Sequence, residues 1–388
     1  MSYFVLLYIS LFIFSNQKSF NMQNISKEFS LYDFQYKLFH QIILSKETEN
    51  IILSPISIHQ IISLSSNGAI GETQSQIVSA LSSTNVVELN KENSIINSYI
   101  KKDDSMNEHL IISNGIFTIY PPKKTFLEIC NIKYDATSEQ LKSAAQINEW
   151  CAKNTNNKIS KIVDNIDQTI MILINAVYFK AQWREPFEPE FTNKELFNYN
   201  QQVDMMHQTY NSINYYEDKS VQIIEIPYKN KKFSSIIILP AEGVNVDEFF
   251  STLTKETMRK YYTLMKYNKV VFSMPKFELE YEVTLNEIMK QLGMIDAFDE
   301  NKANFSGITE DIQIFISKIK HKTYMKVDEF GTEAAAVTMM SLDGCCFNPE
   351  QKIYEMKVNR PFFFGIKNED FNDSFIFMSL IKRMNRTN

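Results

Sequence analysis

Glycine and proline are scarce in this chain, with 9 glycines and 10 prolines among 388 residues. Average proteins contain about 7 % glycine and about 5 % proline, so collagen-like chains and proline-rich disordered chains are excluded. The sequence has no G-x-G-x-x-G and no G-x-x-x-x-G-K-[ST] motif, which excludes nucleotide binding through those phosphate loops. Where glycine is this rare, each one is expected to mark a backbone position that other residues tolerate poorly.

Cysteine and histidine are also sparse, and their spacing forms no recognisable site. The 4 cysteines and 5 histidines show no metal-ligand spacing, and neither H-E-x-x-H nor G-x-S-x-G is present. We therefore expect no metal, no cofactor and no enzymatic activity. An unrelated secreted hydrolase would need a catalytic constellation that the sequence does not display.

The chain carries a formal net charge of −6, and its basic runs are short, so nucleic acid is not an expected partner. The apolar stretch from Tyr3 to Phe14 is too short to span a bilayer, which needs about 20 residues. It has the size of a signal peptide, with Ser15 as the small residue before the cleavage site. We predict a signal peptide over residues 1–15, a single domain over 16–388, and a secreted, extracellular glycoprotein. The N-x-[ST] sequons are Asn24, Asn304, Asn372 and Asn385.

Helical patterns dominate the first part of the chain, and strand patterns dominate the second. Ser54-Pro55 is typical of a helix start, because proline suits the first helical position. Helices are predicted over 30–43, 56–66, 72–81, 144–153 and 284–292. Strands are predicted over 110–120, 169–179, 221–228, 233–239, 270–281, 312–327, 353–358, 362–366 and 375–381. This order indicates an α+β fold without a linker or an internal repeat.

The segment over 328–352 does not fit this pattern. It is a long connection between two predicted strands, but it is apolar and poor in charge, unlike a disordered chain. Every second residue from Thr332 to Leu342 is uncharged, which indicates a latent strand with one face that can be buried. A short helix capped at Thr332 is the alternative, since alanine-rich runs favour helix. On the pattern alone, both interpretations stay open.

The stretch from Glu329 to Ala336, read as EFGTEAAA, resembles the hinge of inhibitory serpins. NIILSPIS over 50–57, NAVYFKAQW over 175–183 and NRPF over 359–362 are similar to other serpin motifs and follow in serpin order. The match extends over nearly the whole chain after the leader. The resemblance implies the serpin fold, with three β-sheets, about eight to nine helices and an exposed reactive-centre loop over about 329–350.

The resemblance further implies a secreted suicide inhibitor of serine proteases. A protease cleaves the reactive loop and forms an acyl-enzyme, and the loop then inserts as a new strand into the central sheet. The residues that match the hinge are Gly331, Thr332, Glu333, Ala334, Ala335 and Ala336. The usual loop length places the reactive bond between Cys345 and Cys346. A redox-sensitive role, or pairing with another chain, stays open for these two cysteines.

No Lys or Arg occurs over 332–350, so a trypsin-like target is not expected. A chymotrypsin-, cathepsin G- or elastase-like serine protease fits the apolar residues near the reactive bond, and a cysteine protease stays open. Two residues depart from the family pattern: Phe330 replaces the usual charged residue, and Val337 is bulkier than the usual small one. They motivate the alternative of a non-inhibitory serpin that acts as a binding or carrier protein.

Two polar clusters are also implied by the resemblance. Residues that match the shutter, a cluster that holds the central sheet closed, are Ser54, Ser57, Asn175 and His321. Residues that match the breach, where the loop enters the sheet, are Trp183, Lys276 and Glu329. A helix near Val87 to Lys102 corresponds to the heparin-binding helix of some serpins but is not strongly basic. We therefore expect a monomer without glycosaminoglycan activation, nucleic acid or membrane partners.

Overall fold

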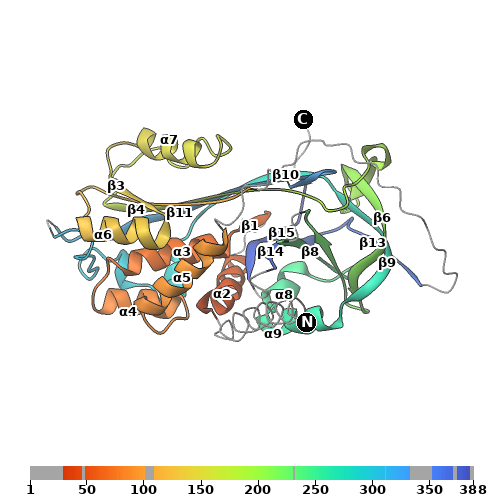
Figure 1. Cartoon of the computed structure of the whole chain (residues 1–388), viewed down its shortest axis with the longest axis horizontal. Helices are drawn as coiled ribbons and strands as arrows, with labels where there is room; N and C mark the ends of the chain where they lie inside the picture. The colour runs from red at the N-terminus through yellow and green to blue at the C-terminus, as the bar shows by residue number, and fades with distance from the viewer. Residues whose placement is uncertain are drawn as a thin grey trace, which may run out of the picture.

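The computed structural model describes residues 29–45, 49–100, 109–229, 232–310, 312–332, 352–369 and 374–384. Within these ranges, four helices precede all but one of the strands, and the later chain is rich in strands (Figure 1). The expected α+β composition is therefore confirmed. None of the helices in these ranges has the length and apolar character needed to cross a membrane.

The five helices predicted from the sequence patterns begin and end close to where the patterns place them. Helix α3 begins at Pro55, as expected, and all its residues are buried. The helix predicted before Gly293 is confirmed, and this glycine has a φ of +99°, a conformation that other residues avoid. The α-helices in the described ranges are α2 (Ser30–Leu44), α3 (Pro55–Ser66), α4 (Glu72–Ala80), α5 (Val86–Ile100), α6 (Lys124–Ile129), α7 (Ala144–Asn154), α8 (Val246–Ser251), α9 (Lys255–Leu264) and α10 (Asn286–Gln291).

A six-stranded sheet forms the centre of the molecule. In spatial order its strands are β10 (Phe277–Thr284), β11 (Ile316–Asp328), β12 (Gly331–Thr332), β4 (Met171–Gln182), β2 (His109–Thr118) and β3 (Thr137–Gln140). The first nine residues of β4 are all buried, which confirms a strand covered on both faces. Strands β4 and β11 run parallel and pair directly over part of their length.

The remaining strands form a nine-stranded sheet. Its order is β1 (Ile51–Leu53), β15 (Phe375–Ile381), β14 (Phe362–Asn368), β8 (Phe233–Pro240), β7 (Val221–Pro227), β6 (Gln201–Glu217), β9 (Lys266–Pro275) and β13 (Ile353–Lys357), with β5 (Asn193–Phe197) also paired to β6. The 17-residue strand β6 pairs with β9 over most of its length and with β7 at its end. Because β6 joins the two strand groups, the expected three sheets are seen as two hydrogen-bonded sheets.

The strand predicted over 270–281 is in fact two strands in different sheets. Strand β9 ends at Pro275 and pairs with β6, whereas β10 begins at Phe277 and pairs with β11. Proline has no N–H for the ladder, and the next N–H, that of Lys276, donates to the carbonyl of Asp204. The prediction of one strand was wrong because the side-chain pattern does not reveal the change of sheet. The polar strand β6 and helices α8 and α9 were not predicted either.

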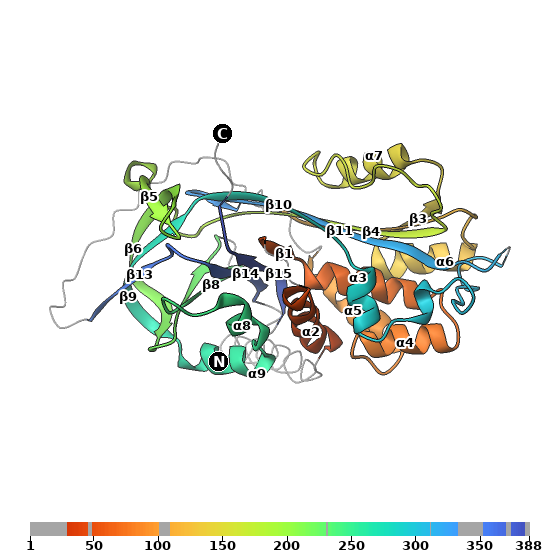
Figure 2. The same cartoon turned by 180° about the vertical axis from the view of Figure 1, so that it is seen from behind.

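Layers of helix cover both faces of the six-stranded sheet. Helix α7 lies alone over one face, and α3 and α5 lie on the other, as the two opposite views agree (Figures 1 and 2). A small apolar cluster under α7, with Ile147 and Cys151 against Ile172 and Ile174, is separate from the main core. Any strand that enters between β4 and β11 must therefore fit between these two layers.

Candidate functional site

The site lies where the parallel strands β4 and β11 part. They pair directly from Met171 and Ile316 to Val177 and Thr323. Further along, the short strand β12 lies between them, with Thr332 antiparallel to both Val327 and Ala181. The first two residues of the predicted hinge are therefore already part of the central sheet. The remaining hinge residues, Glu333, Ala334, Ala335 and Ala336, lie outside the described residues.

Gly331 occupies a position that no other residue could take without displacing its neighbours. Its φ is +153°, and a Cβ atom added there would lie 2.1 Å from the carbonyl oxygen of Ala181. Real Cβ contacts of that length do not occur, so the backbone of β4 would have to move. The expectation that this rare glycine marks a demanding backbone position is confirmed.

Thr332 is fully buried and has a polar partner. Its Oγ1 shares a hydrogen bond of 2.7 Å with the hydroxyl of Tyr228. The Tyr228 ring is stacked on Trp183, with 4.5 Å between the ring centroids and an interplanar angle of 14°. Tyr228 was not singled out from the sequence, because it lies 104 residues from Thr332 and nothing in its own segment points to the hinge.

The three residues predicted for the breach lie together at the same end of the sheet. Lys276 Nζ donates to Glu329 Oε1 at 3.0 Å, and Thr192 Oγ1 donates to the same oxygen at 2.8 Å. Trp183 contacts the turn before the hinge, because its indole N–H donates to the Asp328 carbonyl at 3.0 Å. The structure thus brings Trp183, Lys276 and Glu329 together around the turn that leads into β12.

The Glu329 carboxylate is buried, and its pKa is set by opposing effects. Its side chain is 6 % exposed, and burial by itself raises the pKa of a carboxyl. Hydrogen bonds from Lys276 and Thr192 outweigh burial and hold the pKa of Glu329 below its usual range. The Glu329 side chain is therefore ionised at neutral pH and depends on Lys276 for its compensation.

The residues predicted for the shutter form a buried cluster across the β4–β11 pair. Asn175 and His321 lie opposite each other in this parallel pairing. The Ser54 backbone N–H donates to His321 Nε2 at 3.2 Å, which makes Nε2 an acceptor. His321 Nδ1 therefore carries the proton and donates to Asn175 Oδ1 at 2.5 Å, and Ser57 Oγ donates to the same oxygen at 2.7 Å.

Ser54 takes part in this cluster through its backbone and not through its side chain. Its hydroxyl is buried and has no hydrogen-bond partner among the described residues. His321 is fully buried, and desolvation lowers its pKa from 6.5 to about 3, so the imidazole is neutral. A neutral ring matches its partners, because a second ring proton would face the Ser54 N–H.

A chain of amide side chains extends from the shutter into the helical layer. Asn175 Nδ2 donates to Asn114 Oδ1 at 2.7 Å, and Asn114 Nδ2 approaches Gln60 Oε1 at 3.5 Å. Gln60 Nε2 donates to Asn97 Oδ1 at 2.8 Å, and Asn97 Nδ2 donates to the Lys133 carbonyl at 3.1 Å. Each amide donates outward to the next group, so α3 and α5 are connected to the centre of the sheet. The sequence carries no motif that identifies these residues.

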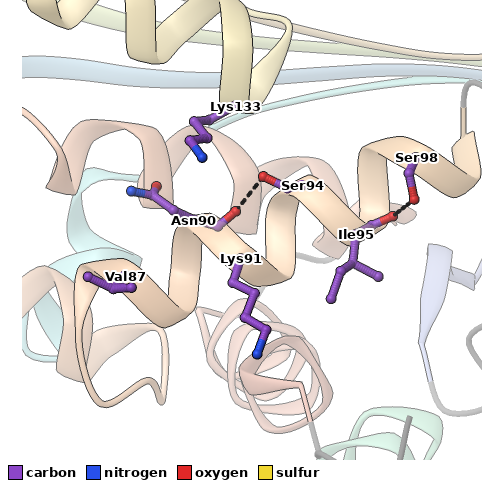
Figure 3. Close-up of a pocket in the computed structure, with 7 residues that line it drawn as sticks. All are labelled: Val87, Asn90, Lys91, Ser94, Ile95, Ser98 and Lys133. Atoms are coloured by element: carbon purple, nitrogen blue, oxygen red, sulfur yellow. Dashed lines mark hydrogen bonds between the residues drawn. The ribbon is translucent and has the colours of Figure 1, made fainter. Parts of the chain in front are cut away.

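A shallow groove of about 510 Å³ runs along α5, the helix that was expected near Val87 to Lys102 (Figure 3). Lys91 and Lys133 are the cations among its seven lining residues. The hydroxyls of Ser94 and Ser98 donate to carbonyls of α5 itself, at 2.8 and 2.7 Å. The groove contains no hinge, shutter or breach residue and presents a weak basic surface.

Other predicted sites fall partly outside the described residues. The reactive bond between Cys345 and Cys346 and the segment over 1–15 lie outside them and stay predictions. Asn304 is exposed, whereas Asn24, Asn372 and Asn385 lie outside the described ranges. Cys130 and Cys151 are buried free thiols, and burial raises the pKa of each to about 12. No group of three or more His, Cys, Asp or Glu within the described part of the chain is arranged to hold a metal ion.

Comparisons with known proteins identify the family. A family model described as Serpin (serine protease inhibitor) matches residues 30–382. Human Serpin B8 is 31 % identical over 355 residues, which cover 85 % of this chain and 92 % of Serpin B8. The native structure of the thermophilic serpin tengpin matches with a TM-score of 0.83 and 33 % identity, covering 92 % of this chain and 94 % of tengpin.

A structure of thyroxine-binding globulin in complex with thyroxine also matches, with a TM-score of 0.82 and 25 % identity. The match covers 92 % of this chain and 99 % of that protein. The hinge, the clusters around it and these relatives agree with one another. This chain therefore belongs to the serpin family of serine protease inhibitors and is not an enzyme.

Proposed function

We propose that this protein inhibits serine proteases as a suicide substrate. The observation that carries the proposal is strand β12, which places the first hinge residues between β4 and β11 before any cleavage. The uncharged Thr332 is already buried there, and the alanines that follow are small enough to enter behind it. Insertion then extends a strand that is already started.

The register of β12 supports an insertion that fills the whole length of β4. Continued along β4, this register would bring Thr338 beside Asn175 and His321 on insertion, and Leu342 beside Met171, where β4 begins. This span matches the uncharged alternate positions from Thr332 to Leu342. About 11 residues at about 3.3 Å each carry the end of the loop roughly 36 Å along the sheet. Entry at Thr338 would separate His321 from Asn175, so the shutter must open during insertion.

The chemistry that precedes insertion is acyl transfer. The serine Oγ of the protease attacks the carbonyl carbon of Cys345, and the bond to the Cys346 nitrogen breaks. The serine proton ends on the released amine, and an ester joins the loop to the protease. Insertion that outpaces hydrolysis of this ester leaves a covalent complex. The lack of Lys and Arg over 332–350 supports a chymotrypsin-, cathepsin G- or elastase-like target.

The setting of this activity is also part of the proposal. The apolar leader over 1–15 and the sequons support a secreted glycoprotein that acts as a monomer. The weak basic surface along α5 supports inhibition without glycosaminoglycan activation. Edman sequencing of the protein secreted by eukaryotic cells tests the leader, and an N-terminus at Met1 would contradict it.

The test of inhibition is incubation with chymotrypsin, cathepsin G and elastase, followed by denaturing electrophoresis. We expect a complex that survives SDS, and mass spectrometry of the C-terminal fragment that denaturation frees from it would locate the reactive bond. Thr332→Arg should convert the inhibitor into a substrate, because an unpaired charge is costly to bury between β4 and β11. Thr263→Arg, at an exposed position on α9, is the matched control. Cleavage without a complex by every protease would exclude the inhibitory proposal.

A carrier function is the second candidate. It is favoured by the match to thyroxine-binding globulin and by the bulky residues Phe330 and Val337 near the hinge. A carrier that does not insert its loop would gain no thermal stability after loop cleavage. A large rise in melting temperature on cleavage would exclude this candidate in favour of insertion.

A further inference from the structure

Tyr228 lies just beyond the end of a strand, and its backbone, its ring and its hydroxyl all make specific contacts. It follows β7 directly, is fully buried and forms an isolated antiparallel bridge with Trp183. Its ring stacks on Trp183 and meets Phe179 of β4 edge-on, with 5.4 Å between the ring centroids. These two contacts fix the direction of the hydroxyl, which reaches Thr332 Oγ1 at 2.7 Å.

The position of Thr332 matters because the following residues have to enter the sheet after it. On one side, the backbone of β12 pairs with two residues of β11, and on the other side with two residues of β4. A strand of two residues has few backbone hydrogen bonds, so a side-chain bond between buried groups contributes a large share of its anchoring. The Tyr228–Thr332 bond provides that side-chain anchor.

We propose that Tyr228 is a positioning residue that holds Thr332 between β4 and β11 and thereby decides how often cleavage leads to trapping. The inference rests on the proposed inhibitory function. After acylation, insertion competes with hydrolysis of the ester. A hinge that is already anchored starts insertion at once, whereas a released hinge must first find the opening. Loss of the anchor therefore favours release of cleaved, inactive inhibitor.

The direct test is Tyr228→Phe, which removes only the hydroxyl and keeps the ring contacts with Trp183 and Phe179. We expect insertion to be about fivefold slower, the factor that corresponds to one ordinary buried hydrogen bond. The number of inhibitor molecules consumed per trapped chymotrypsin should rise severalfold. Tyr210→Phe is the matched control, because the Tyr210 hydroxyl is also buried but has no hydrogen-bond partner among the described residues.

Insertion can be followed through a tryptophan next to the hinge. The chain has 2 tryptophans, Trp150 and Trp183, and a Trp150→Phe background leaves Trp183 as the single reporter. Stopped-flow fluorescence gives the insertion rate, and the appearance of the cleaved chain on denaturing gels after rapid quenching gives the acylation rate. We expect Tyr228→Phe to lower the insertion rate and to leave the acylation rate unchanged. A general loss of stability would not change one of these rates alone.

Thr332 variants keep the inference testable if Tyr228→Phe does not fold. Thr332→Val removes the hydroxyl and should reproduce the effect of Tyr228→Phe, whereas Thr332→Ser keeps a hydroxyl and should retain normal trapping. The double variant Tyr228→Phe/Thr332→Val should show no larger effect than either single variant, because both remove the same hydrogen bond. An unchanged ratio of trapping to turnover in Tyr228→Phe, with the wild type forming complexes, would overturn the role of Tyr228. A wild type that forms no complex at all would instead overturn the proposed function.

Discussion

Acidification should weaken this protein through one buried histidine, and the effect can be isolated by a single substitution. His321 has a pKa of about 3 in the folded protein, compared with 6.5 when exposed. Because the pKa of His321 is lower in the folded protein than in the unfolded chain, the unfolded chain becomes protonated at a higher pH, and this protonation favours unfolding. His321 therefore contributes its full stability above pH 6.5 and loses that contribution as the pH falls from 6.5 towards 3.

The size of the effect follows from the two pKa values. A solution at pH 5 is 1.5 pH units below the pKa of His321 in the unfolded chain, so the residue is protonated there. In the folded protein His321 is still neutral at this pH. Each unit corresponds to about 1.4 kcal/mol, so protonation of the unfolded chain lowers the free energy of unfolding by about 2 kcal/mol between pH 7.5 and pH 5. The two pKa values limit the total loss to about 5 kcal/mol at still lower pH.

His321→Gln is the perturbation that isolates this contribution. A glutamine amide can donate to Asn175 and accept from the Ser54 N–H, but it does not titrate. Urea denaturation of both proteins at pH 7.5, 6.5, 5.5 and 5.0 gives the two pH profiles. All other groups, including the buried His59, are common to both proteins and cancel in the difference. The wild type should lose about 2 kcal/mol more than the variant between pH 7.5 and pH 5.

Profiles that run parallel within about 0.5 kcal/mol would refute the assignment of a neutral, buried His321. A variant that lost stability equally at every pH would show only a packing defect. The difference in slope between the two profiles reports the titration of His321, whereas the absolute stability of either protein does not.

Three further predictions concern the breach, the amide chain and the thiols. Lys276→Gln should lower the free energy of unfolding by about 2 kcal/mol, because it leaves the buried Glu329 carboxylate without its cation. The loss is smaller than for a fully buried ion pair, since the Lys276 side chain is 37 % exposed. Asn97→Leu should cost about 1–2 kcal/mol in urea denaturation, because Gln60 Nε2 loses its acceptor. Cys130 and Cys151 should resist a thiol reagent until the protein unfolds, because both are buried and have raised pKa values.

Matched variants separate these effects from general damage. Lys290→Gln removes an exposed ion pair with Glu287 and should change stability by less than about 0.5 kcal/mol. Lys91→Leu changes an exposed residue on the same helix as Asn97 and should be similarly mild. Equal losses in a test variant and its control would contradict the corresponding contact. Rapid labelling of all four cysteines in the native protein would contradict the burial of the two thiols.

Much of the fold could be predicted because its signals are local. The start of α3 at Pro55 and the end of α10 before Gly293 follow from residues whose backbone preferences are strong. The buried strand β4 follows from an uninterrupted apolar run. The change of sheet at Pro275 could not be predicted, since both flanking strands carry similar alternating patterns and only their partners differ.

The sequence predicted which residues belong to the hinge, the shutter and the breach, but not the contacts that these residues make with one another. These residues were recognised through their resemblance to serpin motifs, whereas Tyr228, Thr192 and Gln60 have no local signal. Hydrogen bonds such as that between Lys276 and Glu329 join residues 53 positions apart, and the bond between Asn175 and His321 spans 146 positions. No pattern within one segment can report a distance of this kind.

The sequence by itself determined that a rare glycine, Gly331, precedes a latent strand that has one uncharged face and contains no Lys or Arg. Only the tertiary structure decided that β4 and β11 part at one end, that Thr332 is already anchored between them, and that His321 is neutral. The physical reason is that backbone preference and side-chain polarity belong to each residue, whereas strand pairing, burial and the pKa shifts depend on neighbours that folding brings together.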